Sequence, residues 1–188
     1  MHHFVSNNIA AACQAVQQGK VIAYPTEAVF GLGCDPANLE AVQRILTLKQ
    51  RPAHKGLILI AADLQQLAPW LLPLEAALLQ QILPTWPGAV TWLLPVRPEV
   101  SPLIRGEHDT LAVRVTAHPV CRELCQCLGH PLISTSANLN GQEPARNVAE
   151  ILQQFDQQLG FVLDAPLGGQ LQPTQIRDGR TGQVIRAS

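Results

Sequence analysis

The chain has 188 residues, of which 47% are hydrophobic, 14% charged and 4% aromatic, and its formal net charge at pH 7 is -1. This composition is typical of a globular protein, and the length predicts a single domain over residues 1–188. The near-neutral charge and the few aromatic side chains argue against a protein that binds long nucleic acids through bulk positive charge or stacked bases.

The cysteines and the apolar segments exclude further classes of protein. The chain has 5 cysteines and no CxxC pair, which favours a reducing compartment over a disulfide framework. Cys121 and Cys125 share one face of a predicted helix, but no third ligand is suitably spaced, so we expect no metal site. The most apolar region, residues 67–96, is interrupted by prolines and cannot supply the ~20 apolar residues of a membrane span. Because no secretory leader is recognisable, we expect a cytoplasmic protein.

In the first half of the chain, short helices and strands are predicted to alternate. A helix capped by Ser6 or Asn7 is expected to end at Gly19. It is followed by a strand at residues 21–24, a glycine-containing loop at 26–35, a helix at 39–49 and a strand at 57–61. A helical region that begins at Asp63 and is divided by Pro73 completes this half.

The second half is predicted to be richer in strands. The expected elements are strands at residues 89–94 and 111–115, a helix at 119–129, a strand at 132–134, a polar loop at 135–141, a helix at 147–159 and an extended segment at 161–163. Residues 174–177 and 183–186 are predicted to pair as a hairpin across the turn at 178–182. Helices and strands alternate irregularly, so the predicted fold class is mixed α/β: an open twisted mixed sheet flanked by helices.

A basic segment follows the second predicted helix. It contains Lys49, Arg51 and Lys55, and no acidic residue occurs between residues 41 and 62. On a nearly neutral chain this imbalance predicts a site for an anion such as phosphate, because arginine offers a planar fork to phosphate oxygens and lysine a mobile point charge. The alternative is a solvated helix end, whose cations complement the last carbonyls. We expect Lys49 and Arg51 to be exposed.

Two polar motifs occur where predicted strands end. Residues 24–33, YPTEAVFGLG, contain two glycines at which backbone can approach a ligand closely. Residues 134–138, STSAN, supply hydroxyl groups and an amide that can hold polar ligand groups. Neither motif matches the GxGxxG or GxxxxGK[ST] phosphate-binding patterns. Each could also be an ordinary turn whose side chains bond to their own backbone.

Together these segments resemble the YrdC/TsaC family of threonylcarbamoyl-AMP synthases. Four motifs carry the resemblance in family order: YPTEAVFGLG at 24–33, KQRP at 49–52, LAVRV at 111–115 followed by His118-Pro119, and STSAN at 134–138. The resemblance covers residues 21–186 and is to the short bacterial form, without the additional carboxyl-terminal domain of the long form. It implies a YrdC-like fold with a basic concave face.

The resemblance also implies a reaction. L-threonine, bicarbonate and ATP would give threonylcarbamoyl-AMP and pyrophosphate, and downstream threonylcarbamoyl-transfer enzymes would pass the acyl group to adenosine 37 of tRNA, forming t6A. ATP is therefore expected as a substrate, with Mg²⁺ carried on its phosphates. No carboxylate cluster marks a metal site built by the protein. Weak tRNA binding is possible as a partner interaction, and no membrane is implied.

The site residues follow from the same resemblance. The family's K-x-R…S-x-N tetrad falls on four positions, with the two cations expected at the triphosphate and the two short side chains at phosphate oxygens or the carbamate: Lys49, Arg51, Ser136 and Asn138. The implied ATP contacts are Lys55, Thr110 and Arg186. The implied L-threonine contacts are Thr26, Arg114, Ser134 and Thr174, with Arg114 pairing the carboxylate.

The chain departs from the long-form pattern at four positions. Ala28 and Phe30 stand where long-form members commonly have threonine and tyrosine. Ile60 stands where those members have a histidine, near the end of the strand after the basic loop, and Pro173 replaces the serine of a Ser-Thr pair. These departures concern the details of the threonine pocket and not the ATP site.

Two other functions fit parts of the sequence. A non-catalytic module for structured RNA could use the same basic concave surface, making many phosphate contacts and few base contacts. The sequence pI of about 6.6 argues against it, because RNA-binding domains are usually basic. A relative that transfers a different carbamoyl group could share the fold, but such proteins carry additional domains.

Overall fold

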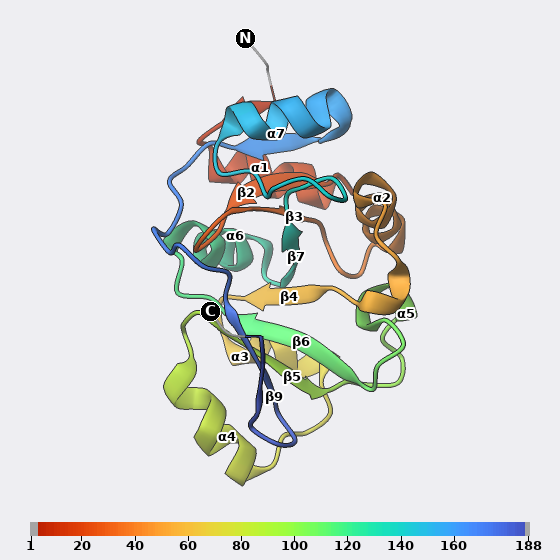
Figure 1. Cartoon of the computed structure of the whole chain (residues 1–188), viewed down its shortest axis with the longest axis vertical. Helices are drawn as coiled ribbons and strands as arrows, with labels where there is room; N and C mark the ends of the chain where they lie inside the picture. Colours follow the sequence, from red (N-terminus) through yellow and green to blue (C-terminus); the bar gives the residue numbers. More distant parts are fainter. Residues whose placement is uncertain (1–3, 187–188) are drawn as a thin grey trace.

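The computed structural model describes residues 4–186, whose strands form one open sheet of ten strands (Figure 1). In sheet order these are β1 (Val5–Ser6), β8 (Phe161–Leu163), β2 (Ile22–Pro25), β3 (Phe30–Gly33), β7 (Leu132–Ser136), β4 (Ile58–Ala61), β6 (Thr110–Val115), β5 (Val90–Pro95), β9 (Gln175–Asp178) and β10 (Val184–Arg186). Neighbours are parallel in the pairs β1/β8, β8/β2, β4/β6 and β5/β9 and antiparallel in the others. The predicted mixed α/β class is confirmed.

Helices flank this sheet. The α-helices are α1 (Ile9–Gln17), α2 (Leu39–Lys49), α3 (Leu64–Leu67), α4 (Ala76–Ile82), α5 (Pro102–Arg105), α6 (Pro119–Leu128) and α7 (Val148–Phe155), and the short 3-10 helices are η1 (Ala53–Lys55), η2 (Ala68–Trp70), η3 (Leu83–Thr85) and η4 (Asp156–Gln158). Helices α7 and α4 lie at opposite ends of the long axis (Figure 1). Within the described residues, every helix is too short or too polar to cross a lipid bilayer.

Several predicted boundaries need correction. The first helix is capped by Asn8, whose Oδ1 accepts a hydrogen bond from the N–H of Ala11 at 3.0 Å, so the expected caps Ser6 and Asn7 are wrong. Ser6 lies in β1, a strand too short to show any periodicity. The strand expected to end at Ser134 continues to Ser136, and the helix expected to reach Leu159 ends at Phe155 and is followed by η4. Helix α5 was not predicted.

The largest error concerns β3, which occupies part of the predicted loop at 26–35. It pairs with β2 and β7, so it lies inside the sheet. The sequence does not predict this strand because it contains Gly31 and Gly33, and glycine is depleted in strands. A Cβ on Gly33 would lie 2.6 Å from Cε1 of Tyr24 and 2.4 Å from the carbonyl oxygen of Ile133, so the ring of Tyr24 occupies the space that a side chain would need.

The helices leave part of one sheet face uncovered. On this face α1 and α6 pack over Tyr24, Ile60 and Leu132. Residues two apart in a strand face the same side, so Ser134 and Ile58, which pair with each other, extend the same face beyond these helices. We call this whole face of the sheet, including the part that α1 and α6 cover, the cavity face. The opposite face carries the larger apolar core, to which α2 and α7 contribute.

Candidate functional site

A cavity of about 350 Å³ opens on the uncovered part of the cavity face. It lies where β2 and β7 end and where β3 and β4 begin. Its lining comprises Thr26, Ala28, Val29, Phe30, Gly31, Arg51, Leu57, Ile58, Arg114, Ser134, Thr135, Ser136, Pro144, Pro173, Thr174 and Arg186. Three of these residues are arginines and none is acidic, so the cavity is suited to anions.

Lys49 lies beside this cavity and is bonded to the turn that follows β7. Its Nζ donates to the carbonyl oxygens of Ser136 and, at 3.1 Å, Asn138, and to Oδ1 of Asn138 at 2.9 Å. The hydroxyl of Ser136 donates to the same Oδ1 at 2.7 Å. A lysine ammonium has three N–H groups. Three residues of the predicted tetrad, Lys49, Ser136 and Asn138, are therefore in contact. Lys49 binds the turn but does not itself line the cavity.

The expected exposure of Lys49 is wrong. The residue is only 6% exposed, because the last turn of α2 directs its side chain toward the end of β7 and away from solvent. Burial, followed by the nearby charge of Arg51, lowers the pKa of Lys49 to about 8. The alternative of a solvated helix end does not describe this residue.

Arg51, the fourth member of the tetrad, reaches the cavity from the loop after α2. It is half-buried, so its expected exposure is also wrong. Its Nε and Nη2 donate to the carbonyl oxygen of Gly56 at 3.3 and 3.0 Å. Burial lowers the pKa of this guanidinium. The backbone contact fixes the side chain while its cation remains in the cavity wall.

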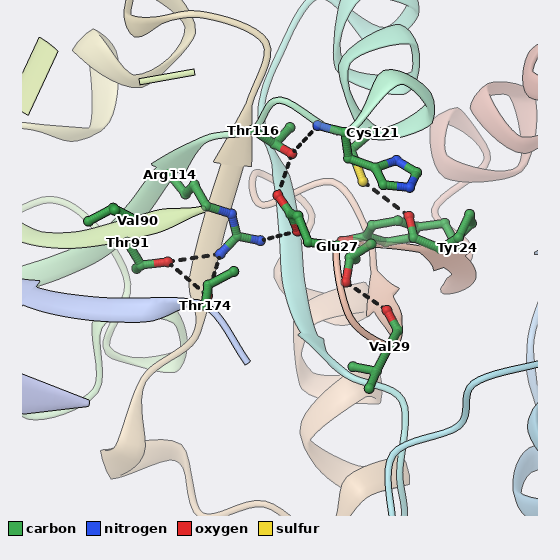
Figure 2. A network of polar contacts seen from close by, with 12 residues as sticks. Tyr24, Glu27, Val29, Val90, Thr91, Arg114, Thr116, Cys121 and Thr174 are labelled. Atoms are coloured by element: carbon green, nitrogen blue, oxygen red, sulfur yellow. Dashed lines mark hydrogen bonds and ion pairs between the residues drawn. The ribbon is translucent and has the colours of Figure 1, made fainter. Parts of the chain in front are cut away.

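Arg114 is the centre of a buried polar network (Figure 2). Its Nη1 donates to the hydroxyls of Thr91 at 2.8 Å and Thr174 at 3.1 Å, and its Nη2 forms an ion pair with Oε2 of Glu27 at 3.3 Å. The other carboxylate oxygen of Glu27 accepts from the hydroxyl of Thr116 at 2.8 Å. Arg114 is 4% exposed and still contributes to the cavity wall.

The carboxyl-terminal hairpin brings two predicted residues to the same wall. Strands β9 and β10 pair antiparallel, which confirms the predicted hairpin. Arg186 on β10 donates from Nε and Nη2 to the carbonyl oxygen of Thr174 at 3.3 and 2.9 Å. Partial burial and the charge of Arg114 lower the pKa of Arg186. Thr174 therefore contacts both arginines, through its hydroxyl and its carbonyl.

The remaining predicted residues divide into two groups. Thr26 and Ser134 line the cavity, and the hydroxyl of Thr26 donates to the carbonyl oxygen of Val29 at 2.6 Å. Lys55 and Thr110 lie outside the lining. Lys55 is exposed in η1, and Thr110 begins β6 two residues before Ala112, which pairs with Ile58 at the start of β4. Lys55 and Thr110 therefore lie near the start of β4, on the side where Arg51 contacts Gly56.

Of the four positions that depart from the long-form pattern, three line the cavity: Ala28, Phe30 and Pro173. Ile60 does not. It is fully buried beneath α6 and belongs to the core. The departures at Ala28, Phe30 and Pro173 therefore change side chains that line the cavity. The departure at Ile60 changes a side chain that packs in the core.

Sequence reasoning missed the residues that hold Arg114 in place. Thr91 faces it from β5, and Glu27 and Thr116 follow β2 and β6. Glu27 is the one acidic residue of the YPTEAVFGLG motif. Its position in that motif was the sequence signal that could have identified it as a partner of a cationic side chain. In residues 4–186 no group of three or more His, Cys, Asp or Glu side chains is arranged to hold a metal ion.

Comparisons with known proteins match nearly the whole chain. A sequence model of the Sua5/YciO/YrdC family, described as "Telomere recombination", matches residues 14–188. The threonylcarbamoyl-AMP synthase of Idiomarina loihiensis is 56% identical over 180 residues, which cover 94% of this chain and 95% of the relative. The enzyme of the same name from Nitrosococcus oceani is 52% identical over 178 residues, which cover 95% of this chain and 96% of the relative.

A solved structure extends the likeness to three dimensions. P. abyssi Sua5, crystallised with L-threonine, matches with a TM-score of 0.85 at 28% sequence identity. The match covers 93% of this chain and 53% of that one, so the present chain spans about half of the Sua5 protein. The matched part confirms the expected YrdC-like fold.

Proposed function

The chain belongs to the Sua5/YciO/YrdC family, and we infer that it is a threonylcarbamoyl-AMP synthase, a nucleotidyltransferase acting on L-threonine, bicarbonate and ATP in the formation of t6A in tRNA. The structural observation that carries this function is the cavity lined by Arg51, Arg114 and Arg186 and by hydroxyl groups. The carbamate and the triphosphate repel each other, and fixed cations in a partly enclosed site offset that repulsion.

The reaction needs no nucleophile from the protein. The amine of threonine forms a bond to the carbon of CO2 released from bicarbonate and becomes a carbamate, and the proton that the amine loses combines with the hydroxide left from bicarbonate to form water. A carbamate oxygen then forms a bond to the α-phosphorus of ATP while the bond to the β-phosphate oxygen breaks, and pyrophosphate leaves with that electron pair. The protein has to hold two anions in line and stabilise the charge on the leaving group.

Residues at the Ser136–Asn138 turn form the phosphate end of the proposed site. Arg51 would contact phosphate oxygens directly, because its guanidinium is part of the cavity wall. Lys49 would hold the turn and supply positive charge from behind Ser136, since its Nζ already contacts the turn. Ser136 and Asn138 would anchor a phosphate or carbamate oxygen.

The nucleotide contacts are proposed to extend from this turn. Lys55 and Thr110 lie toward the Gly56 end of the sheet and would contact ATP outside the cavity, while Arg186 would contact it from the hairpin. Magnesium would arrive bound to the phosphates, because the cavity wall consists of cations, hydroxyls and apolar groups and offers no carboxylate ligand.

The amino acid is proposed to bind at the opposite end of the cavity. Thr26, Ser134 and Thr174 would hydrogen-bond to L-threonine, and Arg114 would pair with its carboxylate. The binding of L-threonine by P. abyssi Sua5 supports a threonine site in the shared fold.

The product is a mixed carboxylic-phosphoric anhydride and is reactive. We propose that it is consumed in the cytoplasm by separate enzymes that transfer the threonylcarbamoyl group to tRNA, and that tRNA itself binds this protein only weakly. The near-neutral net charge supports weak RNA binding, because tight non-specific binding requires many cationic contacts.

Pyrophosphate release by the purified protein tests the function. We expect release only when ATP, L-threonine and bicarbonate are all present, together with an adenylate detectable by mass spectrometry. L-serine should be the poorer substrate by roughly 1 to 3 kcal/mol, because it lacks a methyl group that an apolar wall can contact. Equal rates in CO2-free buffer without bicarbonate would reject the mechanism.

The same preparation distinguishes the enzyme from an RNA-binding module. The enzyme should turn over without RNA and bind tRNA weakly. An RNA-binding module would bind tRNA tightly, with an affinity that falls steeply with salt, and would form no adenylate. The names of the relatives favour the enzyme.

Replacing Arg51 with alanine tests its proposed phosphate contact. Arg51→Ala should lower kcat/KM for ATP about ten- to a hundredfold, because each charge-assisted hydrogen bond contributes roughly 1.5 to 3 kcal/mol. Arg44→Ala is the matched control. Arg44 is exposed in α2 and donates to the carbonyl oxygen of Gln158, and it does not line the cavity. Steady-state rates of both variants check the assignment, and wild-type kinetics for Arg51→Ala would contradict it.

A further inference from the structure

Glu27 lies behind the cavity and is bonded to a residue that lines it. The side chains of Glu27 and Arg114 are only 8% and 5% exposed, and their ion pair measures 3.3 Å. Arg114 belongs to the cavity wall, whereas Glu27 does not. A buried guanidinium needs a compensating charge, and Glu27 is the acidic group placed to supply it. Glu27 therefore acts on the cavity through Arg114.

The contacts of Glu27 also fix the orientation of the Arg114 guanidinium. Its Oε1 is held by the hydroxyl of Thr116, and that hydroxyl accepts a hydrogen bond from the backbone N–H of His118 at 3.1 Å. The position of Oε2 is thereby tied to the backbone after β6. On the other side Thr91 and Thr174 hold Nη1 of Arg114. The guanidinium is thus fixed at both ends, with one end defined by the carboxylate.

Because of Glu27, the three arginines of the cavity differ in whether a carboxylate compensates their charge. In the described part of the chain, Arg51 and Arg186 donate to backbone carbonyls and have no carboxylate within ion-pair distance, whereas Arg114 is paired with Glu27. Arg114 is therefore the compensated cation of the wall, whereas Arg186, which lies beside Arg114 through their shared contact with Thr174, and Arg51 are uncompensated. A triphosphate favours uncompensated cations, while an amino acid with one carboxylate and one amine needs less positive charge.

We propose that Glu27 is a positioning residue: it holds the guanidinium of Arg114 in the orientation that binds the amino acid's carboxylate and compensates the charge of that guanidinium, so that Arg114 favours a single carboxylate over a polyphosphate. This inference rests on the proposed function. It assigns to Glu27 no contact with substrate. It also gives the acidic residue of the YPTEAVFGLG motif a role in selectivity in addition to its structural one.

The test compares L-threonine with L-threoninamide, which keeps the amine and side chain but lacks the carboxylate. In the wild-type protein kcat/KM should be higher for threonine. Glu27→Gln preserves the shape of the side chain and removes its charge. It should reduce the threonine-to-threoninamide ratio about tenfold or more, equivalent to about 1.4 kcal/mol, by raising KM for threonine while KM for ATP stays near the wild-type value. Inorganic triphosphate should become a competitor of threonine in this variant only.

Two further variants separate positioning from stability. Thr116→Val is nearly isosteric and removes the hydroxyl that holds Oε1, so it should lower the ratio in the same direction by a smaller factor. Glu75→Gln removes an exposed carboxylate at the start of α4 that does not line the cavity, and it should leave the ratio unchanged. A variant that merely folds poorly loses active protein, which lowers kcat for both substrates equally and does not move the ratio.

An unchanged ratio in both Glu27→Gln and Thr116→Val would overturn the inference. Failure of the proposed function is recognised separately, because the wild-type protein would then release no pyrophosphate from ATP, threonine and bicarbonate. In that case, calorimetric binding of threonine and threoninamide to the same variants decides the role of Glu27. A selective loss of threonine affinity supports it, and equal affinities across the variants reject it.

Discussion

Lys49 combines two properties that rarely occur together in a surface helix. It ends α2, where a lysine usually extends into solvent, yet its ammonium is enclosed by oxygens of the Ser136–Asn138 turn. Lysine is almost never fully buried unless it is paired. Here neutral carbonyl and amide oxygens satisfy its donors, and within residues 4–186 no carboxylate forms an ion pair with it. Replacing it should therefore change the stability of the turn as well as catalysis, contrary to the expectation for an exposed residue.

The lowered pKa of Lys49 predicts a dependence of stability on pH. Its pKa is about 8 in the folded protein against an ordinary value of 10.5, so between these pH values the unfolded chain binds a proton that the folded chain has lost. The free energy of unfolding attributable to Lys49 should therefore rise with pH across this window. Urea unfolding of the wild type and of Lys49→Met at several pH values measures the effect as a difference.

Subtracting the Lys49→Met values removes the contribution of other groups that titrate in the same window. The difference between wild type and variant should be constant below about pH 7 and should increase from pH 8 to 10.5 in favour of the wild type. A difference that does not vary with pH would mean that the hydrogen bonds from the turn keep the ammonium charged, with a pKa near its ordinary value.

At the scale of elements, β3 shows how glycines shape the site. Its two glycines face the same side of the sheet, but they have different neighbours. A Cβ on Gly33 would collide with Tyr24 and with the backbone of β7, whereas a Cβ on Gly31 would meet Cγ2 of Thr26 at 3.2 Å at the edge of the cavity. Gly33 is therefore needed for packing, and Gly31 keeps space open in the cavity.

Alanine at these two positions should have separable effects. Gly33→Ala should lower the free energy of unfolding by about 1 to 3 kcal/mol, since a collision with backbone cannot be relieved by a rotamer change. Gly31→Ala should be milder for stability and should raise KM for substrate, because the added methyl group narrows the cavity. Chemical denaturation and steady-state kinetics of both variants check this. Equal losses of stability would contradict the distinction.

At the scale of the whole molecule, one sheet connects the amino-terminal and carboxyl-terminal segments. Strand β1 comes first in the strand order and β10 last, and the hairpin that contains β9 crosses in front of β5 and β6 (Figure 1). The cavity draws on segments near both halves, from Thr26 to Arg186. This continuity supports the prediction of a single domain over residues 1–188.

A single domain should unfold in one transition. The three tryptophans, Trp70, Trp86 and Trp92, all lie near β5 and report on one half of the sheet. Far-ultraviolet circular dichroism reports on all helices, including α1 and α7 of the other half. We expect the urea midpoints from tryptophan fluorescence and circular dichroism to coincide. An earlier or later fluorescence transition would divide the chain into two cooperative units.

Features that are local in the chain could be predicted from the amino-acid sequence. Most of the helices, the short apolar strands and the carboxyl-terminal hairpin could be predicted because their signals lie within a few residues. The four motifs carried the family resemblance, and through it the tetrad and Arg114. Strand β3 escaped this reasoning, because two of its residues are glycines whose place in the sheet depends on the ring of Tyr24.

Which of these residues contact one another and which are buried depends on the three-dimensional arrangement of the strands. Lys49 reaches Ser136 across 87 positions of sequence, and Glu27 reaches Arg114 across the same separation. Neither pairing has a local signal, because each depends on the order in which distant strands join the sheet. That order placed β7 between β3 and β4 and left the cavity face uncovered beside α6. The burial of Lys49 and the carboxylate behind Arg114 are consequences of strand order, which no spacing of residues along the chain reveals.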